Sequence, residues 1–234
     1  MKFLFSIGFF LLLIFFSNFI LAKDIKINLV ENYDIEFGKI DIGKLYFQYL
    51  DSPKEYKISI NIQDKGFFSG LYKFRGQYDV VGVKRNDLFY PFNYNQSWKT
   101  QKKNSIINIV FKNGILRSLK VLPEEKELAR INYIGLENHL DPISSFFSIL
   151  KGAQKVDTID GRRVYSMNVV DSKIVEKNIH KKIEIQNYVN IWADHKRKDL
   201  RYIEVVQKLE SEPLEMPLII KIKLNNFLIK LKKN

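Results

Sequence analysis

Residues 56–63 read YKISINIQ, a strict alternation of apolar and polar side chains. In an extended strand, Tyr56, Ile58, Ile60 and Ile62 would share one face and the polar residues between them the other. This period of two predicts a half-buried antiparallel strand, with one face on a core and the other in water. The same rhythm returns along most of the chain and predicts a mainly β protein.

Other strands of this kind are separated by turn signals. Asn113 and Gly114 both tolerate positive φ and predict a tight hairpin, and Asp160 with Gly161 predicts a second turn. The predicted strands cover residues 107–111, 116–121, 156–159, 164–170, 183–192 and 200–209, followed by one final strand from 218 to 231.

One short helix interrupts the strands. Asp141 can cap its start, Pro142 suits its first turn, and Gly152 suits its end. So short a helix needs tertiary packing to be stable. We therefore expect a curved antiparallel sheet, or a partly open β-barrel or clamshell, with this helix packed on it. Residues 123–139 could form either a helical turn or a lid-like loop.

The first 22 residues have the pattern of an export signal. Lys2 precedes an apolar run, and Ala22 is a small residue before Lys23. We expect cleavage there, export to the periplasm of a Gram-negative-type bacterium, and one β-rich domain over residues 23–234. The alternative is an inner-membrane anchor formed by residues 3–21, which are almost long enough to span a bilayer.

Composition limits what holds the chain together and what it binds. The sequence contains no Cys, so neither a disulfide nor a lipid on a terminal cysteine is expected. The formal net charge is +12, which could favour anionic phospholipid or another anionic partner. The cations are spread between strands and no recognition motif accompanies them, so no nucleic acid partner is expected.

Residues with catalytic potential are few. The three histidines show no metal-ligand spacing, so we expect no metal and no cofactor. A hydrolase would require His139, Asp141 and Ser144 to meet in a cleft. A capping aspartate beside an exposed histidine explains the same residues more simply, and we assign no catalytic residue.

Aromatic side chains are the most distinctive feature of the mature region. They could line an apolar cavity between a curved sheet and the short helix, or they could simply fill the core. The candidate ligand-binding residues are Phe67, Phe68, Tyr72, Phe74, Tyr90, Tyr94, Trp98, Phe146, Phe147 and Trp192. Cations beside them could attract an anionic headgroup, namely Lys65, Lys73, Arg75, Lys84 and Arg85.

Five segments together resemble the domain of unknown function 3108 family of exported bacterial proteins. They are GLYKFRG (70–76), LFYPFNYNQSW (88–98), LDPISSFFSIL (140–150), IDGRRVY (159–165) and VNIWADHKRKDLRYIEV (189–205). The likeness implies a signal peptide and a curved antiparallel sheet or partly open barrel, in a family without an assigned biochemical role. Leu200 and Arg201 depart from the proline often present after the charged turn.

Two functional hypotheses follow. The first is a non-enzymatic envelope protein that holds a lipid or another amphiphile, which requires an enclosed apolar cavity opening near the helix. The second is a structural module with a filled core that docks another envelope protein through a strand edge or its basic face. An enzyme is a third alternative.

Overall fold

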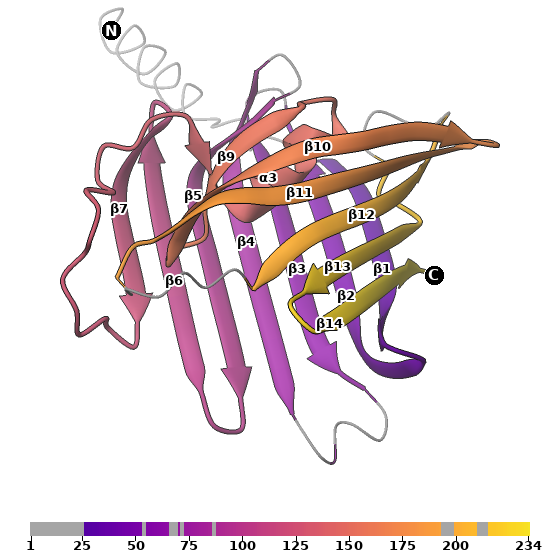
Figure 1. The fold of residues 1–234 in the computed structure, drawn as a ribbon, viewed down its shortest axis with the longest axis horizontal. Helices are drawn as coiled ribbons and strands as arrows, with labels where there is room; N and C mark the ends of the chain where they lie inside the picture. Colours follow the sequence, from indigo (N-terminus) through magenta and orange to yellow (C-terminus); the bar gives the residue numbers. More distant parts are fainter. Residues whose placement is uncertain are drawn as a thin grey trace, which may run out of the picture.

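The computed structural model describes residues 26–52, 55–65, 70, 73–85, 88–192, 199–209 and 215–234. Its elements form a 14-stranded sheet that curls into a nearly closed barrel around one short helix (Figure 1). Strands β1 to β7 form one wall, β9 to β14 cross in front of it, and α3 lies between the two. The expectation of a partly open β-barrel with one packed helix is therefore confirmed.

The strands follow one another almost in sequence order. The first wall contains β1 (Lys26–Phe37), β2 (Ile40–Asp51), β3 (Tyr56–Asp64), β4 (Phe74–Arg85), β5 (Leu88–Thr100), β6 (Asn104–Lys112) and β7 (Ile115–Leu122). After β8 (His139–Leu140) and α3 (Pro142–Leu150) come β9 (Lys155–Ile159), β10 (Arg163–Val175), β11 (Asn178–Asn190), β12 (Leu200–Lys208), β13 (Ile219–Leu224) and β14 (Phe227–Lys233).

Antiparallel pairing of β1 with β14 joins the first and last strands of the chain. The opposite ends of the sheet are β7 and β8, which leaves one seam unsealed. Residues 135–138 partly bridge it, because Leu116 donates to the carbonyl of Leu136 at 2.9 Å and Gly135 donates to the carbonyl of Leu116 at 2.9 Å. The stretch 123–138 thus forms a loop along the seam rather than a helical turn.

The hairpin around Asn113 and Gly114 is confirmed, since φ is 55° and 75° at these residues and β6 pairs with β7. The prediction of one final strand from 218 to 231 is wrong. The chain reverses at Asn225 and Asn226 and forms the β13–β14 hairpin. The physical reason is that two turn-favouring asparagines stand between two short alternating runs, whose apolar faces pair across the turn.

The core fills the interior of the barrel around α3. The Phe147 ring stacks on Phe47 at 5.5 Å and lies 5.6 Å from Phe89, measured between ring centroids. Phe89 also meets the ring of Tyr56 at 4.9 Å. The helix therefore lies inside the barrel, with its aromatic side chains packed against the wall. No helix of the described residues is long and apolar enough to cross a membrane.

Candidate functional site: an apolar cavity inside the barrel

An apolar cavity of about 260 Å³ lies between α3 and the strands near the join of β1 and β14. Its wall comes from both halves of the sheet, and the first half of α3 covers it. The lining residues are Tyr33, Leu45, Ile60, Ile62, Tyr78, Pro142, Ile143, Phe146, Phe147, Ile203, Met216, Ile220, Ile222 and Leu231.

The alternation in β3 explains how the wall is built. Ile58, Ile60 and Ile62 share the inner face because they are two residues apart. Ile58 is completely buried, whereas Ile60 and Ile62 are half-buried and line the cavity. Tyr78 on β4 pairs in register with Ile60 and lines the cavity too. The apolar face of one strand thus serves both as core and as cavity wall.

Asp141 holds α3 in place from the end that faces the cavity. Its Oδ1 accepts hydrogen bonds from the backbone of Ile143 at 2.9 Å and of Ser144 at 3.1 Å, and its Oδ2 accepts one from the Ser144 hydroxyl. The Tyr56 hydroxyl and Ser144 Oγ are 2.8 Å apart. Asp141 is fully buried, and this burial raises its pKa from 3.8 to about 6 against the opposing effect of these hydrogen bonds.

The other serines of α3 face the barrel wall. The hydroxyl of Thr158 on β9 donates to Ser145 Oγ at 2.8 Å, and the backbone of Phe89 donates to Ser148 Oγ at 3.2 Å. Ser144, Ser145 and Ser148 are completely buried. The hydroxyl groups on the polar side of the helix thus have hydrogen-bond partners in the barrel wall. The apolar side of the helix faces the cavity.

Of the ten aromatic residues named as ligand-binding candidates, Phe146 and Phe147 line this cavity. Phe67, Phe68 and Tyr72 lie outside the described residues. Tyr94 is buried in the core, with its hydroxyl 3.0 Å from Gln96 Oε1.

The remaining four candidates make contacts away from the cavity. Phe74 stacks on Trp98 at 5.7 Å between ring centroids. Tyr90 lies under the guanidinium of Arg85, and Trp192 packs against a tyrosine of the seam loop. Aromatic density in the sequence could not separate these environments, because it says nothing of which rings converge.

Several lining residues were not among the candidates, in particular Tyr33, Leu45, Ile203, Met216 and Leu231. They come from segments far apart in sequence, which the pairing of β1 with β14 brings together. The alternation of apolar residues in 45–49 (LYFQY) was a usable signal for one of these strands.

A second hollow, of about 360 Å³, lies near the ends of β3, β4 and β5 and is lined mostly by charged and polar residues. Its lining contains Lys73, Phe74, Arg75 and Lys99, together with Asp64, Thr100 and Gln101. The other cations named with these have local partners: Lys65 lies 3.5 Å from Asp34, Lys84 pairs with Asp51, and Arg85 lies over Tyr90.

The structure brings together two of the three residues that a hydrolase would use. Asp141 and Ser144 are hydrogen-bonded to each other. His139 instead places Nδ1 2.7 Å from the backbone carbonyl of Glu137. Within the described part of the chain, no hydrogen bond joins His139 to either residue. Asp141 and Ser144 form the cap of α3, in the arrangement typical of a helix start.

These features define a class of protein, a nearly closed β-barrel with an internal helix and an apolar cavity. A crystal structure from Brucella abortus, described as a beta-barrel-like protein of domain of unknown function DUF1849, is similar to this chain. The TM-score is 0.51 at 11% sequence identity, over 89% of this chain and 98% of that one. The likeness shows the fold alone. No family model and no curated protein matches the sequence.

Proposed function

We propose that the protein is a non-enzymatic carrier of the cell envelope, which holds the apolar part of a lipid or similar amphiphile inside the barrel. The single observation that carries this proposal is the cavity of about 260 Å³ bounded by aliphatic and aromatic side chains. Apolar cavities of roughly 150 Å³ stay dry and bind benzene, and pockets for drug-sized ligands begin near about 300 Å³. The space therefore suits a short hydrocarbon segment rather than a whole phospholipid.

The proposed location is the periplasm of a Gram-negative-type bacterium, with export directed by residues 1–22. Support comes from the signal-like pattern around Lys2 and Ala22. Membership of the 3108 family is part of the same proposal and rests on the five quoted segments. Anchoring by residues 3–21 is the alternative, and the intact mass of the purified protein distinguishes the two.

The test is native mass spectrometry of protein purified from the envelope of the cells that produce it. We expect a co-purifying amphiphile, which organic extraction would release and identify. Ile222→Phe places a larger side chain in the cavity wall and should lower ligand occupancy, because the added volume competes for the space. Ile106→Phe adds the same ring at an exposed position of β6 and should leave occupancy unchanged.

The outcomes separate the proposed function from its alternative. Loss of the ligand in the Ile222→Phe variant alone would support carriage within this cavity. A wild-type protein without ligand, which also takes up no added fatty acid or lysophospholipid, would overturn carriage. That result would favour a structural or partner-binding envelope module.

A further inference from the structure

The apolar wall of the cavity continues past it toward the β1–β2 and β13–β14 turns. Ile220 and Ile222 of β13 line the cavity, and Ile222 pairs in register with Ile229 of β14. Side chains two positions apart on a strand share a face, so Phe227 lies on the same inner face as Ile229. Phe37 of β1 also pairs with Ile229. The inner face therefore remains apolar up to the turns.

Exposure to solvent rises along this face. Leu231, which lines the cavity, is 6% exposed, whereas Phe37 is 39%, Ile40 52% and Phe227 53% exposed. The rings of Phe37 and Phe227 are 5.7 Å apart between centroids, and Ile40 pairs in register with Phe37. We call Phe37, Ile40 and Phe227 the apolar rim. Three large apolar side chains from two adjacent turns thus face water together.

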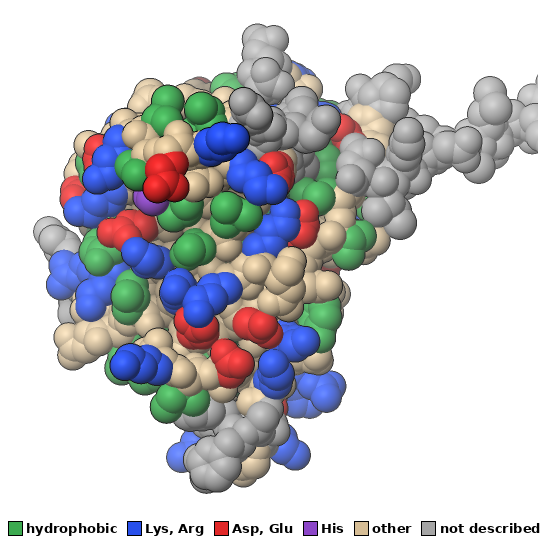
Figure 2. All heavy atoms as spheres, turned by 90° about the vertical axis from the view of Figure 1, so that its right-hand side faces the viewer, with side chains coloured by type: hydrophobic (Ala, Val, Ile, Leu, Met, Phe, Trp, Pro, Cys, Tyr) green, Lys and Arg blue, Asp and Glu red, His purple; other side chains and the backbone are tan. Residues whose placement is uncertain are grey.

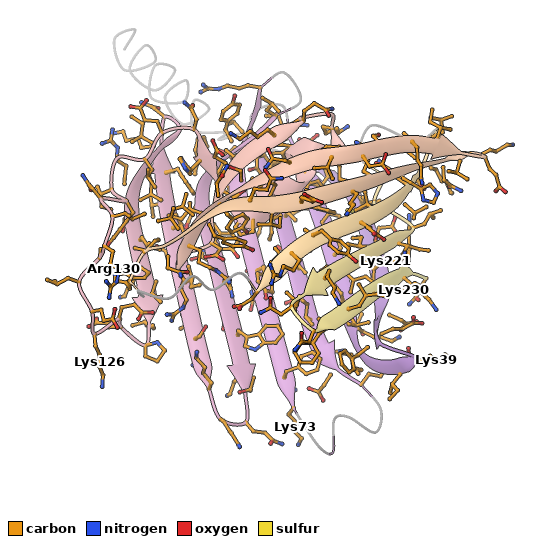
Figure 3. The ribbon with its side chains drawn as sticks, viewed as in Figure 1. Lys39, Lys73, Lys126, Arg130, Lys221 and Lys230 are labelled. Atoms are coloured by element: carbon orange, nitrogen blue, oxygen red, sulfur yellow. The ribbon has the colours of Figure 1, made fainter. Side chains whose placement is uncertain are left out.

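The charges around the apolar rim are mainly positive. Lys39 lies on the β1–β2 turn, and Lys221 and Lys230 lie on β13 and β14 (Figure 3). Lys223 lies on β13 two residues after Lys221. Among the described residues, Lys39, Lys223 and Lys230 have no ion-pair partner. The carboxylates of β1 and β2 nearby are held by other lysines: Glu36 by Lys232, and Asp34 and Asp41 by Lys65 at 3.5 and 3.9 Å.

A mixed surface of this kind is visible from the side of the barrel that Figure 2 presents. Lys and Arg side chains lie there among hydrophobic ones, with fewer acidic groups between them. Amphipathic surfaces bind bilayers through buried apolar area together with attraction of cations to anionic lipids. The apolar rim and the neighbouring Lys39, Lys223 and Lys230 provide both contributions.

We propose that the barrel docks with its apolar rim on an anionic phospholipid bilayer. Phe37, Ile40 and Phe227 enter the interfacial region, and Lys39, Lys223 and Lys230 contact headgroup phosphates. The docking proposal depends on the proposed carrier function only for its biological purpose. A docked barrel would bring its inner apolar face against the acyl chains of the bilayer. The docking itself needs no resident ligand.

The test compares the binding of purified variants to vesicles. All proteins are purified from the envelope, and their intact masses establish that they share one N-terminus. Vesicles of phosphatidylcholine alone are compared with an equimolar mixture of phosphatidylcholine and phosphatidylglycerol. Phe37→Ser combined with Phe227→Ser should weaken binding to the mixed vesicles about tenfold or more, since two rings lose their transfer into the interface.

The β10–β11 turn offers a matched control. Ile174 and Val175 there are 62% and 43% exposed, and Lys177 lies beside them. Ile174→Ser combined with Val175→Ser should leave vesicle binding unchanged. Lys39→Glu should weaken binding to the mixed vesicles several-fold and lose its effect at high salt, whereas Lys177→Glu should not.

A second measurement does not depend on how well the variants fold. Hydrogen exchange of the wild-type protein with mixed vesicles should slow at residues 37–40 and 225–228 and stay unchanged at 174–178. Equal weakening by both serine pairs, protection at the β10–β11 turn alone, or no preference for anionic vesicles would overturn the docking proposal. Docking with an empty cavity would overturn only the carrier function, and a resident ligand without docking would overturn only this inference.

Discussion

Asp141 is expected to make the stability of the barrel fall with rising pH across the weakly acidic range. Its carboxyl group is completely buried at the start of α3, and burial raises its pKa from 3.8 to about 6. Between these two values the folded protein binds more protons at this site than the unfolded chain does. The free energy of unfolding therefore decreases as the pH rises through this range.

The size of the effect follows from the shift. A pKa shift of about two units corresponds to a change of about 3 kcal/mol in the free energy of unfolding, at ~1.4 kcal/mol per unit. Asp141→Asn removes the titration while keeping an oxygen that can accept from the backbone of Ile143 and Ser144. The new amide N–H can donate to Ser144 Oγ, whose own proton can then turn toward Tyr56.

The assay is urea unfolding followed by tryptophan fluorescence from about pH 4 to about pH 7, with both proteins measured at each pH. The variant should gain about 3 kcal/mol relative to wild type across this range. Asp171→Asn, at an exposed position of β10, controls for the loss of one negative charge. A difference between wild type and Asp141→Asn that stays constant with pH would refute the argument.

Further predictions concern packing inside the barrel. A Cβ at Gly76 would lie 2.7 Å from the Trp98 ring, so Gly76→Ala should lower the free energy of unfolding by about 1–3 kcal/mol, whereas Gly70→Ala, with open space around it, should not. Adding Trp98→Ala should remove most of the Gly76→Ala penalty in a double-mutant cycle of urea unfolding. Phe147→Ala should lower the free energy of unfolding by about 3–5 kcal/mol, because Phe147 is only 2% exposed. Phe146→Ala should lower it clearly less, because Phe146 is half-buried. Equal losses for the two variants in thermal or urea unfolding would contradict this.

Local patterns in the sequence were sufficient for much of the fold. The alternation over residues 56–63 became β3, Asn113 and Gly114 turned the β6–β7 hairpin, and Asp141 capped α3. Each of these depends on residues within a few positions of one another. The merged strand from 218 to 231 failed for a related reason: an alternating pattern on both sides of Asn225 and Asn226 has the same period whether the chain continues or reverses.

The cavity was less accessible from sequence. Phe146 and Phe147 could be placed on it because they share a helix face that had to pack somewhere. Tyr33, Leu45 and Leu231 could not, since they meet only through the pairing of β1 with β14. The sequence also could not predict that Trp98 stacks on Phe74 and does not line the cavity.

The sequence by itself determined that this chain forms alternating strands and one capped helix, because side-chain periodicity and turn chemistry act over a few residues. Only the tertiary structure decided that the first and last strands pair and join the two halves of the sheet, that α3 sits inside the barrel, and that a space of about 260 Å³ is left beside the helix. The pairing of the first and last strands, the position of the helix and the size of the cavity depend together on strand curvature, helix length and side-chain volume. These properties involve residues far apart in the sequence, such as Ile35 and its strand partner Leu231. A pattern that spans a few residues cannot encode them.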